Sequence, residues 1–366
     1  MAQVKPDVET FARIKVVGVG GGGGNAVTRM FNAQIKGVDF IAINTDAQDL
    51  HNTKAQTKIH IGKNLTRGLG AGMNPDIGRQ AAEENRDEIQ DVLKGADMIF
   101  ITCGMGGGTG TGASPVIADV AHDVGALVVA VVTKPFSFEG KKRSAIAEEG
   151  LLSLRDRVDT LITIPNDKVL NLIDKNTSII DAFAIIDDIL RQGVQGIADL
   201  ITYPGIINVD FADIKAIISE AGSALMGIGK ATGEDRAIVA AKAAINSPLL
   251  DISIDGARGI LFNVSGGVDL GMVDINEAAK VITESIDSEA RVIFGATHDS
   301  RLKKGEVKVT VIATGFGANK YDNNNPVATP VVNVKKPIVN IEVIDEDEEW
   351  DTPAFLRRKK DTDDKK

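Results

Sequence analysis

Apolar and polar positions along the first half of the chain predict buried strands that alternate with helices. Continuous runs rich in Val, Ile and Ala are typical of strands covered on both faces of a parallel sheet. These runs are residues 14–19, 39–44, 98–103, 126–133 and 160–165. Helical patterns such as 78–93 and 114–124 lie between them. This order predicts a doubly wound, Rossmann-like α/β domain over residues 1–177.

One long helix is predicted after this domain. Apolar side chains recur every three or four residues over 178–201, Ser178 is a possible N-cap, and Tyr203, Pro204 and Gly205 stop the pattern. At 1.5 Å per residue the helix would span roughly 35 Å. We therefore expect residues 178–205 to form a central helix that connects two domains.

A second, smaller α/β domain is predicted for residues 206–317. Apolar segments at 206–209, 259–264 and 307–314 suit strands, and the patterns at 213–221, 235–245 and 275–286 suit helices. Residues 318–350 are rich in Asn and Pro and end in an acidic run, which predicts a flexible linker. Residues 351–366 then form a separate peptide with a basic tail.

Composition narrows the class of protein. The formal net charge of −10 over 366 residues argues against sequence-independent binding to nucleic acid. The single cysteine, Cys103, excludes an intrachain disulfide, and no apolar run approaches the roughly 20 residues that cross a bilayer. The first ten residues lack a signal-peptide core. We expect a cytoplasmic protein that reaches a membrane through partners, with no metal site of its own.

A run of glycines follows the first predicted strand. Glycines let the backbone approach a phosphate at a helix N-terminus, which favours negative charge. The run is Gly20, Gly21, Gly22, Gly23 and Gly24, followed by Asn25. The spacing Gly18-x-Gly20-x-x-Gly23, with Asp46 after the next strand, also satisfies the dinucleotide fingerprint. This loop alone therefore leaves open a dinucleotide-dependent oxidoreductase and a nucleotidase.

A second glycine loop follows the strand predicted at 98–103, and no Walker A motif occurs in the sequence. Two such loops on one sheet could hold a triphosphate from both sides, with threonine hydroxyls as additional donors. The loop comprises Gly104, Gly106, Gly107, Gly108, Thr109, Gly110, Thr111 and Gly112.

The sequence Gly-Gly-Gly-Thr-Gly-Thr-Gly at 106–112 resembles the signature loop of the tubulin/FtsZ family of GTPases. The resemblance covers residues 10–317 and resumes at 351–358. It implies a tubulin/FtsZ-like fold, binding of GTP or GDP with Mg²⁺, GTP hydrolysis and a head-to-tail homopolymer. It further implies a cytoskeletal role in the ring that assembles at the bacterial mid-cell division site.

The resemblance also implies site residues. Both glycine loops would hold the phosphates, and the segment with Ala71 and Gly72 would sense the γ-phosphate. Guanine presents N1–H and N2–H₂ donors, which a carboxylate reads well. The ribose and base would be contacted by Glu139, Arg143, Asn166, Phe183 and either Asp187 or Asp188, a choice that the residues leave open.

Asn208, Asp210 and Asp213 resemble the catalytic loop of the family. Carboxylates here could orient the attacking water or help to place Mg²⁺, although Asp213 could instead be the N-cap of the next helix. The long helix would hold Asp210 roughly 30 Å from the base. A neighbouring subunit would then have to supply this loop, and such a heterologous contact builds open filaments.

The C-terminal peptide resembles the family's recognition peptide. Its candidate partner-binding residues are Asp351, Pro353, Phe355, Leu356 and Arg357. The linker would let these residues reach a groove on division proteins such as FtsA, although a polar end with an incidental Phe-Leu pair is the simpler alternative. Two other functions stay open: an oxidoreductase that uses the first glycine loop, and a nucleotide-binding interaction protein of the same fold without turnover.

Overall fold

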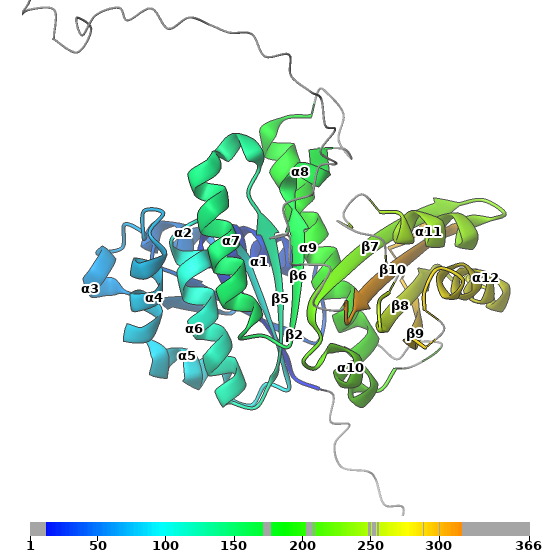
Figure 1. Ribbon diagram of the computed structural model, residues 1–366, viewed down its shortest axis with the longest axis horizontal. Helices are drawn as coiled ribbons and strands as arrows, with labels where there is room; N and C mark the ends of the chain where they lie inside the picture. Colours follow the sequence, from blue (N-terminus) through cyan, green and yellow to red (C-terminus); the bar gives the residue numbers. More distant parts are fainter. Residues whose placement is uncertain are drawn as a thin grey trace, which may run out of the picture. The chain divides into compact units, whose positions relative to one another are not determined.

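The computed structural model describes residues 12–170, 177–202, 207, 209–247, 250, 254, 256–287, 289–299 and 301–316 (Figure 1). Its strands form one sheet in the order β3-β2-β1-β4-β5-β6-β7-β10-β8-β9. The strands are β1 Ile14–Val19, β2 Val38–Asn44, β3 Thr57–His60, β4 Met98–Gly104, β5 Leu127–Lys134, β6 Thr160–Pro165, β7 Gly222–Thr232, β8 Gly259–Gly266, β9 Arg291–His298 and β10 Glu306–Thr314.

Parallel pairing runs from β3 through to β7, and it includes the five strands that the apolar runs predicted, β1, β2, β4, β5 and β6. Strand β10 lies antiparallel to both β7 and β8, and β9 pairs parallel with β8. The prediction of an α/β fold with a largely parallel sheet is therefore confirmed. The division into domains near residues 178 and 206 stays a prediction.

The helices are α1 Gly20–Asn32, α2 Ala47–Asn52, α3 Lys63–Thr66, α4 Pro75–Glu84, α5 Arg86–Leu93, α6 Thr109–Asp123, α7 Lys141–Arg155, α8 Asn166–Val169, α9 Ile179–Thr202, α10 Phe211–Ile218, α11 Arg236–Ile245 and α12 Met272–Thr283. Helices α1, α9 and α10 pack in one apolar core against one face of strands β1, β2 and β4 to β7. Helices α4 to α7 pack in a second core against the opposite face of β1 to β6. Helices α11 and α12 cover β8 and β10.

Several helix boundaries differ from the sequence prediction. The stretch predicted at 78–93 is divided at Asn85 into α4 and α5. Both glycine runs were expected as loops that precede a helix, but α1 begins at Gly20 and α6 at Thr109, six positions before Pro115. Part of each run is therefore the first turn of a helix, where backbone N–H groups have no partner within the helix.

Three strands were missed by the sequence prediction. Strand β7 lacks a continuous apolar run because α11 lies very close to it: a Cβ at Gly227 or at Gly229 would come within 2.0 Å of an α11 carbonyl oxygen. Strand β3 has four residues, and edge strand β9 is exposed or half-buried over its first half. Of the strand expected at 206–209, the described residues show Ile207 bridged to Ala296.

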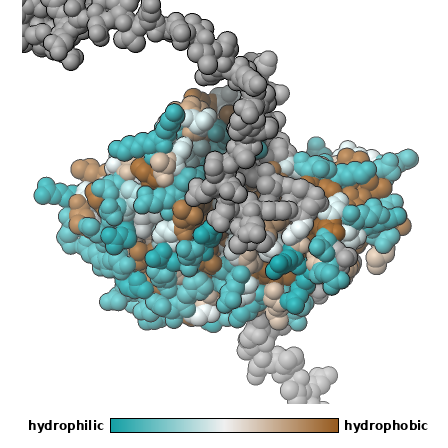
Figure 2. All heavy atoms as spheres, viewed as in Figure 1, coloured by the Kyte–Doolittle hydropathy of each residue, from teal (hydrophilic) through white to brown (hydrophobic). Residues whose placement is uncertain are grey.

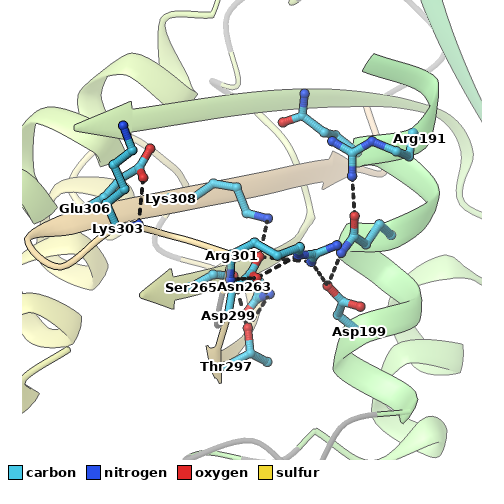
Figure 3. Close-up of polar contacts among 12 residues, drawn as sticks. Arg191, Asp199, Asn263, Ser265, Thr297, Asp299, Arg301, Lys303, Glu306 and Lys308 are labelled. Atoms are coloured by element: carbon cyan, nitrogen blue, oxygen red, sulfur yellow. Dashed lines mark hydrogen bonds and ion pairs between the residues drawn. The ribbon is translucent and has the colours of Figure 1, made fainter. Parts of the chain in front are cut away.

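Helix α9 has 24 residues and matches the predicted long helix, with Ser178 Oγ accepting a hydrogen bond from Asp181 N–H at 3.1 Å. In Figure 1, α8 lies at its upper end and α10 at its lower end. Figure 3 shows how its second half is tied to the C-terminal strands: Arg301 lies 3.9 Å from Asp199 of α9 and 2.8 Å from Asp299. The Arg301–Asp199 pair links the helix to the connection between β9 and β10.

None of the described helices combines the length and apolarity needed to cross a bilayer. The face drawn in Figure 2 is mostly hydrophilic, with smaller apolar patches between hydrophilic residues.

We expect Gly112→Ala to lower the free energy of unfolding by about 3 kcal/mol, because overpacking against backbone is not relieved by a rotamer change. A Cβ at Gly112 would lie 1.9 Å from the carbonyl oxygen of Pro75, where α4 crosses α6. Urea unfolding checks this, with Gly107→Ala as the control, because a Cβ there meets no atom within 4 Å. Equal stability of the two variants would contradict the prediction.

Candidate functional site

A cavity of about 370 Å³ opens at the carboxyl ends of the central strands. Val19 at the end of β1 and Gly104 at the end of β4 both line it. The chain passes from β1 to β2 on one side and has β4 on the other, so the cavity lies at the topological switch point of the sheet. Ligands of open α/β sheets bind at such points.

Most of the candidate binding residues meet at this cavity. It is lined by Gly20, Gly21, Gly22, Asn25, Gly104, Gly107, Gly108, Thr109, Gly110, Glu139, Arg143, Asn166, Phe183 and Asp187. The sequence analysis did not identify Ile186 and Leu190, which also line it. Both follow Phe183 at helical spacing on α9, so the periodicity of the helix was the signal that could have found them.

Two helices begin at the cavity and give it a positive electrostatic character. All residues in the first turns of α1 and α6 are among those described by the structure. These turns contain no acidic side chain, and no side chain caps them with a hydrogen bond. Their free N–H groups and helix dipoles favour an anion. The two turns also touch: Gly20 has a φ of +68°, and a Cβ there would lie 3.1 Å from Gly110 N. Glycine is favoured at position 20 for two reasons: the backbone there is left-handed, and the start of α6 lies too close for a side chain.

Some glycines of the two runs lie outside the cavity lining and are held by packing instead. A Cβ at Gly23 would lie 2.4 Å from the Thr102 carbonyl oxygen, and one at Gly24 would lie 2.8 Å from Thr53 Oγ1. The N–H of Gly106 donates to Thr111 Oγ1 at 2.9 Å. The candidates outside the lining are Gly23, Gly24, Ala71, Gly72, Gly106, Thr111, Gly112 and Asp188.

Ala71 and Gly72 nevertheless belong to a segment that abuts the second glycine loop. A Cβ at Gly108 would lie 2.7 Å from Ala71 Cβ and 3.0 Å from Asn74 N. A shift of this segment would therefore be transmitted to the backbone of the glycine loop, because close-packed groups cannot move independently.

One end of the cavity suits a flat ring with polar edges. Phe183 is 41% exposed and its ring meets Phe136 edge to face at a centroid distance of 5.5 Å. Asn166 is 5% exposed, and its Oδ1 has no hydrogen-bond partner in the described part of the chain. A buried polar atom without a partner is costly. A ligand with a hydrogen-bond donor at this point would satisfy it.

Glu139 and Arg143 form an ion pair at 3.1 Å on the wall of the cavity. Glu139 Oε1 also accepts from the Phe136 N–H at 2.9 Å, which fixes the carboxylate. Arg143 Nε is buried and has no partner among the described residues. A sugar hydroxyl or a phosphate oxygen would complete its hydrogen bonding.

The structure separates the two neighbouring aspartates of α9. Asp188 accepts from Arg191 Nε at 2.7 Å and Gln192 Nε2 at 2.8 Å. Although burial alone would raise the pKa of Asp188, these hydrogen bonds lower it below its ordinary value. Asp187 lines the cavity, and burial raises its pKa from 3.8 to about 6 against the opposing charge of Arg29. Asp187 is therefore the carboxylate that a ligand in this cavity can reach.

We expect Asp187→Asn to stabilise the nucleotide-free chain by about 2 kcal/mol at pH 8. A raised pKa means that the stability contributed by this group is complete below pH 3.8 and is lost as the pH rises through 6. The amide stays neutral, so its advantage should disappear at pH 4. Urea unfolding at both pH values measures this, and an advantage of the same size at pH 4 and pH 8 would contradict the assignment to ionisation.

The candidate catalytic residues lie away from this cavity. Asp210 is the N-cap residue of α10, without a capping hydrogen bond from its side chain among the described residues, and Asp213 is in the first turn. Asp210, not Asp213, thus occupies the N-cap position. Both side chains are exposed and neither lines the cavity. Helix α9 continues for 19 residues beyond Phe183 and for 15 beyond Asp187, which puts roughly 20 to 30 Å of helix between these residues and the helix end that precedes Asp210.

Other candidates cannot be placed. Asn208 and the tail residues from Asp351 to Arg357 lie outside the described residues. Among the described residues, no group of three or more His, Cys, Asp or Glu side chains is arranged to hold a metal ion.

Comparison with known proteins identifies the family. The sequence profile described as "Tubulin/FtsZ family, GTPase domain" matches residues 13–174, and that described as "FtsZ family, C-terminal domain" matches residues 222–317. An FtsZ dimer structure from M. jannaschii is 48% identical with a TM-score of 0.81, covering 84% of this chain and 89% of that chain. A point mutant of M. jannaschii FtsZ is 49% identical, with a TM-score of 0.81 and coverage of 84% and 92%.

More distant structures share the fold. CetZ2 from Haloferax volcanii, solved as a GTPγS-bound protofilament, is 21% identical with a TM-score of 0.70, covering 82% of this chain and 92% of that chain. The two matched profiles and the 48% identity to M. jannaschii FtsZ show that the chain belongs to the tubulin/FtsZ family of GTPases.

Proposed function

We propose that this chain binds GTP in the cavity, hydrolyses it between neighbouring subunits and polymerises head to tail to form the ring at the bacterial division site. One observation carries the proposal: the cavity and the two exposed aspartates of α10 lie at opposite ends of α9. A chain built in this way has half of a hydrolytic site at each end. It would be completed by a second copy in the same orientation.

The cavity fits the parts of GTP. The phosphates would lie at the N-termini of α1 and α6, where free N–H groups and Thr109 can donate to them. The base would stack on Phe183, and the Asp187 carboxylate would accept from guanine N1–H and N2–H₂. Mg²⁺ would arrive with the triphosphate and neutralise part of its charge.

Hydrolysis of a γ-phosphate needs a positioned water and charge stabilisation rather than covalent chemistry. We assign the orientation of that water to Asp210 and Asp213 of the adjoining subunit, with Asn208 in the same loop. Their exposure supports this role, because carboxylates that act on a neighbour's ligand must be accessible. Contact through two different surfaces does not close on itself and extends as a filament. Hydrolysis to GDP would remove the γ-phosphate from this contact and weaken it.

The C-terminal peptide would connect the filament to other division proteins such as FtsA, through residues 351–358. Phe355 and Leu356 would be the apolar anchors in a partner's groove. The filament would then reach the membrane through that partner, while the chain itself stays in the cytoplasm.

Light scattering and phosphate release, measured together with Mg²⁺ and each of GTP, GDP and NAD, test this function. We expect scattering and phosphate release with GTP and neither with GDP or NAD. GTP binding without turnover would support a nucleotide-binding interaction protein of the same fold, and binding of NAD alone would support the dinucleotide alternative.

A further inference from the structure

Residues 44–49, which run from the end of β2 into α2, contact both glycine runs and lie next to the segment with Ala71 and Gly72. The Thr45 and Thr109 hydroxyl oxygens lie 2.6 Å apart, which links the segment to the second glycine loop. A Cβ at Gly21 would lie 3.4 Å from Asp49 Oδ2, so the segment also borders the first glycine run. The N–H of Ala47 donates to the Gly68 carbonyl oxygen at 3.1 Å, next to the segment with Ala71 and Gly72.

Thr45 is fixed at the centre of this segment. It is fully buried, and its carbonyl oxygen accepts from the Thr66 hydroxyl at 3.1 Å and lies 3.3 Å from His60 Nε2. Its hydroxyl is the group that points to Thr109. Thr109 lines the cavity and Thr45 does not. Thr109 is therefore the direct link between the Thr45 hydroxyl and a phosphate in the cavity.

The hydroxyl pair has a direct chemical consequence. A threonine hydroxyl has one proton to donate and two lone pairs to accept with. If Thr45 donates to Thr109, the proton of Thr109 is free to turn towards a phosphate oxygen in the cavity. Without the Thr45 hydroxyl, the oxygen of Thr109 loses its partner on the buried side. The Thr109 hydroxyl would then be free to rotate, because its buried-side partner no longer fixes its orientation.

We propose that Thr45 is a positioning residue for the nucleotide phosphates, because its hydroxyl holds that of Thr109 with the proton aimed into the cavity. This inference rests on the proposed GTP-binding function. Sequence analysis assigned position 45 no role, since the two threonines are 64 positions apart.

The test compares three purified full-length variants. Thr45→Val removes the hydroxyl and keeps the branched shape, Thr45→Ser keeps the hydroxyl, and Thr102→Val is the matched control. Thr102 is also a fully buried threonine, on β4 of the same sheet, and its Oγ1 has no hydrogen-bond partner among the described residues. Calorimetric titration with GTP and Mg²⁺, and steady-state phosphate release, give the dissociation constant, KM and kcat.

We expect Thr45→Val to weaken GTP binding about fivefold to tenfold, the usual effect of one hydrogen bond, and to raise KM by a similar factor. Thr45→Ser should restore binding, and Thr102→Val should bind as the wild type does. In a Thr109→Val background, Thr45→Val should add almost nothing, because the effect passes through Thr109. If Thr45→Val does not fold, Thr45→Ala compared with Thr102→Ala makes the same measurement.

Binding by Thr45→Val that equals that of Thr102→Val would overturn the inference. Additive losses in the double variant would also overturn it, because Thr45 would then act independently of Thr109. Failure of the wild-type chain to bind GTP is a different result: it would contradict the proposed function itself.

Discussion

Asp210→Asn is expected to reduce GTP turnover by about 100-fold or more, since loss of a group that acts on the transition state has effects of this size. GTP affinity should stay unchanged, because Asp210 does not line the cavity. Phosphate release at high protein concentration, combined with GTP titration calorimetry, measures both quantities. Asp213→Asn should show the same separation of turnover from binding.

Asp235→Asn is the matched control for this experiment. Asp235 is likewise an exposed N-cap residue, at the start of α11, and it makes no capping hydrogen bond through its side chain among the described residues. Its replacement should leave turnover as it is. If Asp235→Asn and Asp210→Asn reduced turnover equally, the assignment of the catalytic loop to α10 would be wrong.

Mixing two defective chains tests whether the site is shared. Chains with Asp210→Asn keep an intact cavity, and chains with Asp187→Ala keep an intact α10. Where they meet in the productive order, one supplies the nucleotide and the other the carboxylate. We expect the mixture to release phosphate faster than the sum of its components. A rate equal to that sum would argue against a site completed between subunits.

Asp187→Asn is expected to weaken GTP binding by about 100-fold, because it replaces a charge-assisted pair of hydrogen bonds to the base by one acceptor and a misplaced donor. The same change should improve binding of xanthosine triphosphate, whose C2 carbonyl can accept from the new amide. Competition titrations of the two nucleotides against wild-type and variant chains measure the change in preference.

Asp188→Asn is the control that distinguishes loss of a contact to the base from a general disturbance of α9. Asp188 is held by Arg191 and Gln192 and lies outside the cavity lining. Its variant should retain the preference for guanine. If Asp188→Asn changed the preference and Asp187→Asn did not, the roles of the two aspartates would be reversed.

The sequence predicted those strands and helices whose residue pattern is set by burial alone. Strands β1 and β6 coincide with the predicted runs, and α9 differs by one residue at each end, because each carries an uninterrupted apolar pattern. Strand β7 could not be found in this way. Gly227 and Gly229 leave room for the backbone of α11, which packs against β7 but lies further along the chain. A periodicity argument does not detect such tertiary packing.

The candidate site shows the same division between local and tertiary information. The glycine runs located the cavity, but the sequence could not show that Gly20 faces it while Gly23 is held against Thr102. It also left Asp187 and Asp188 equivalent, because their difference arises from the direction of each side chain on α9. The contact between Thr45 and Thr109 joins the residue after β2 to the first residue of α6, and it follows from the order of strands in the sheet.

The dependence of turnover on protein concentration tests the central claim most directly. Phosphate release from GTP with Mg²⁺ should be measured per chain over a wide range of concentrations of the wild-type protein. If the active site is completed by a neighbour, the rate per chain should be near zero at low concentration and rise steeply above a threshold. A rate per chain that is the same at every concentration would mean that each chain hydrolyses GTP alone, and would contradict the shared site.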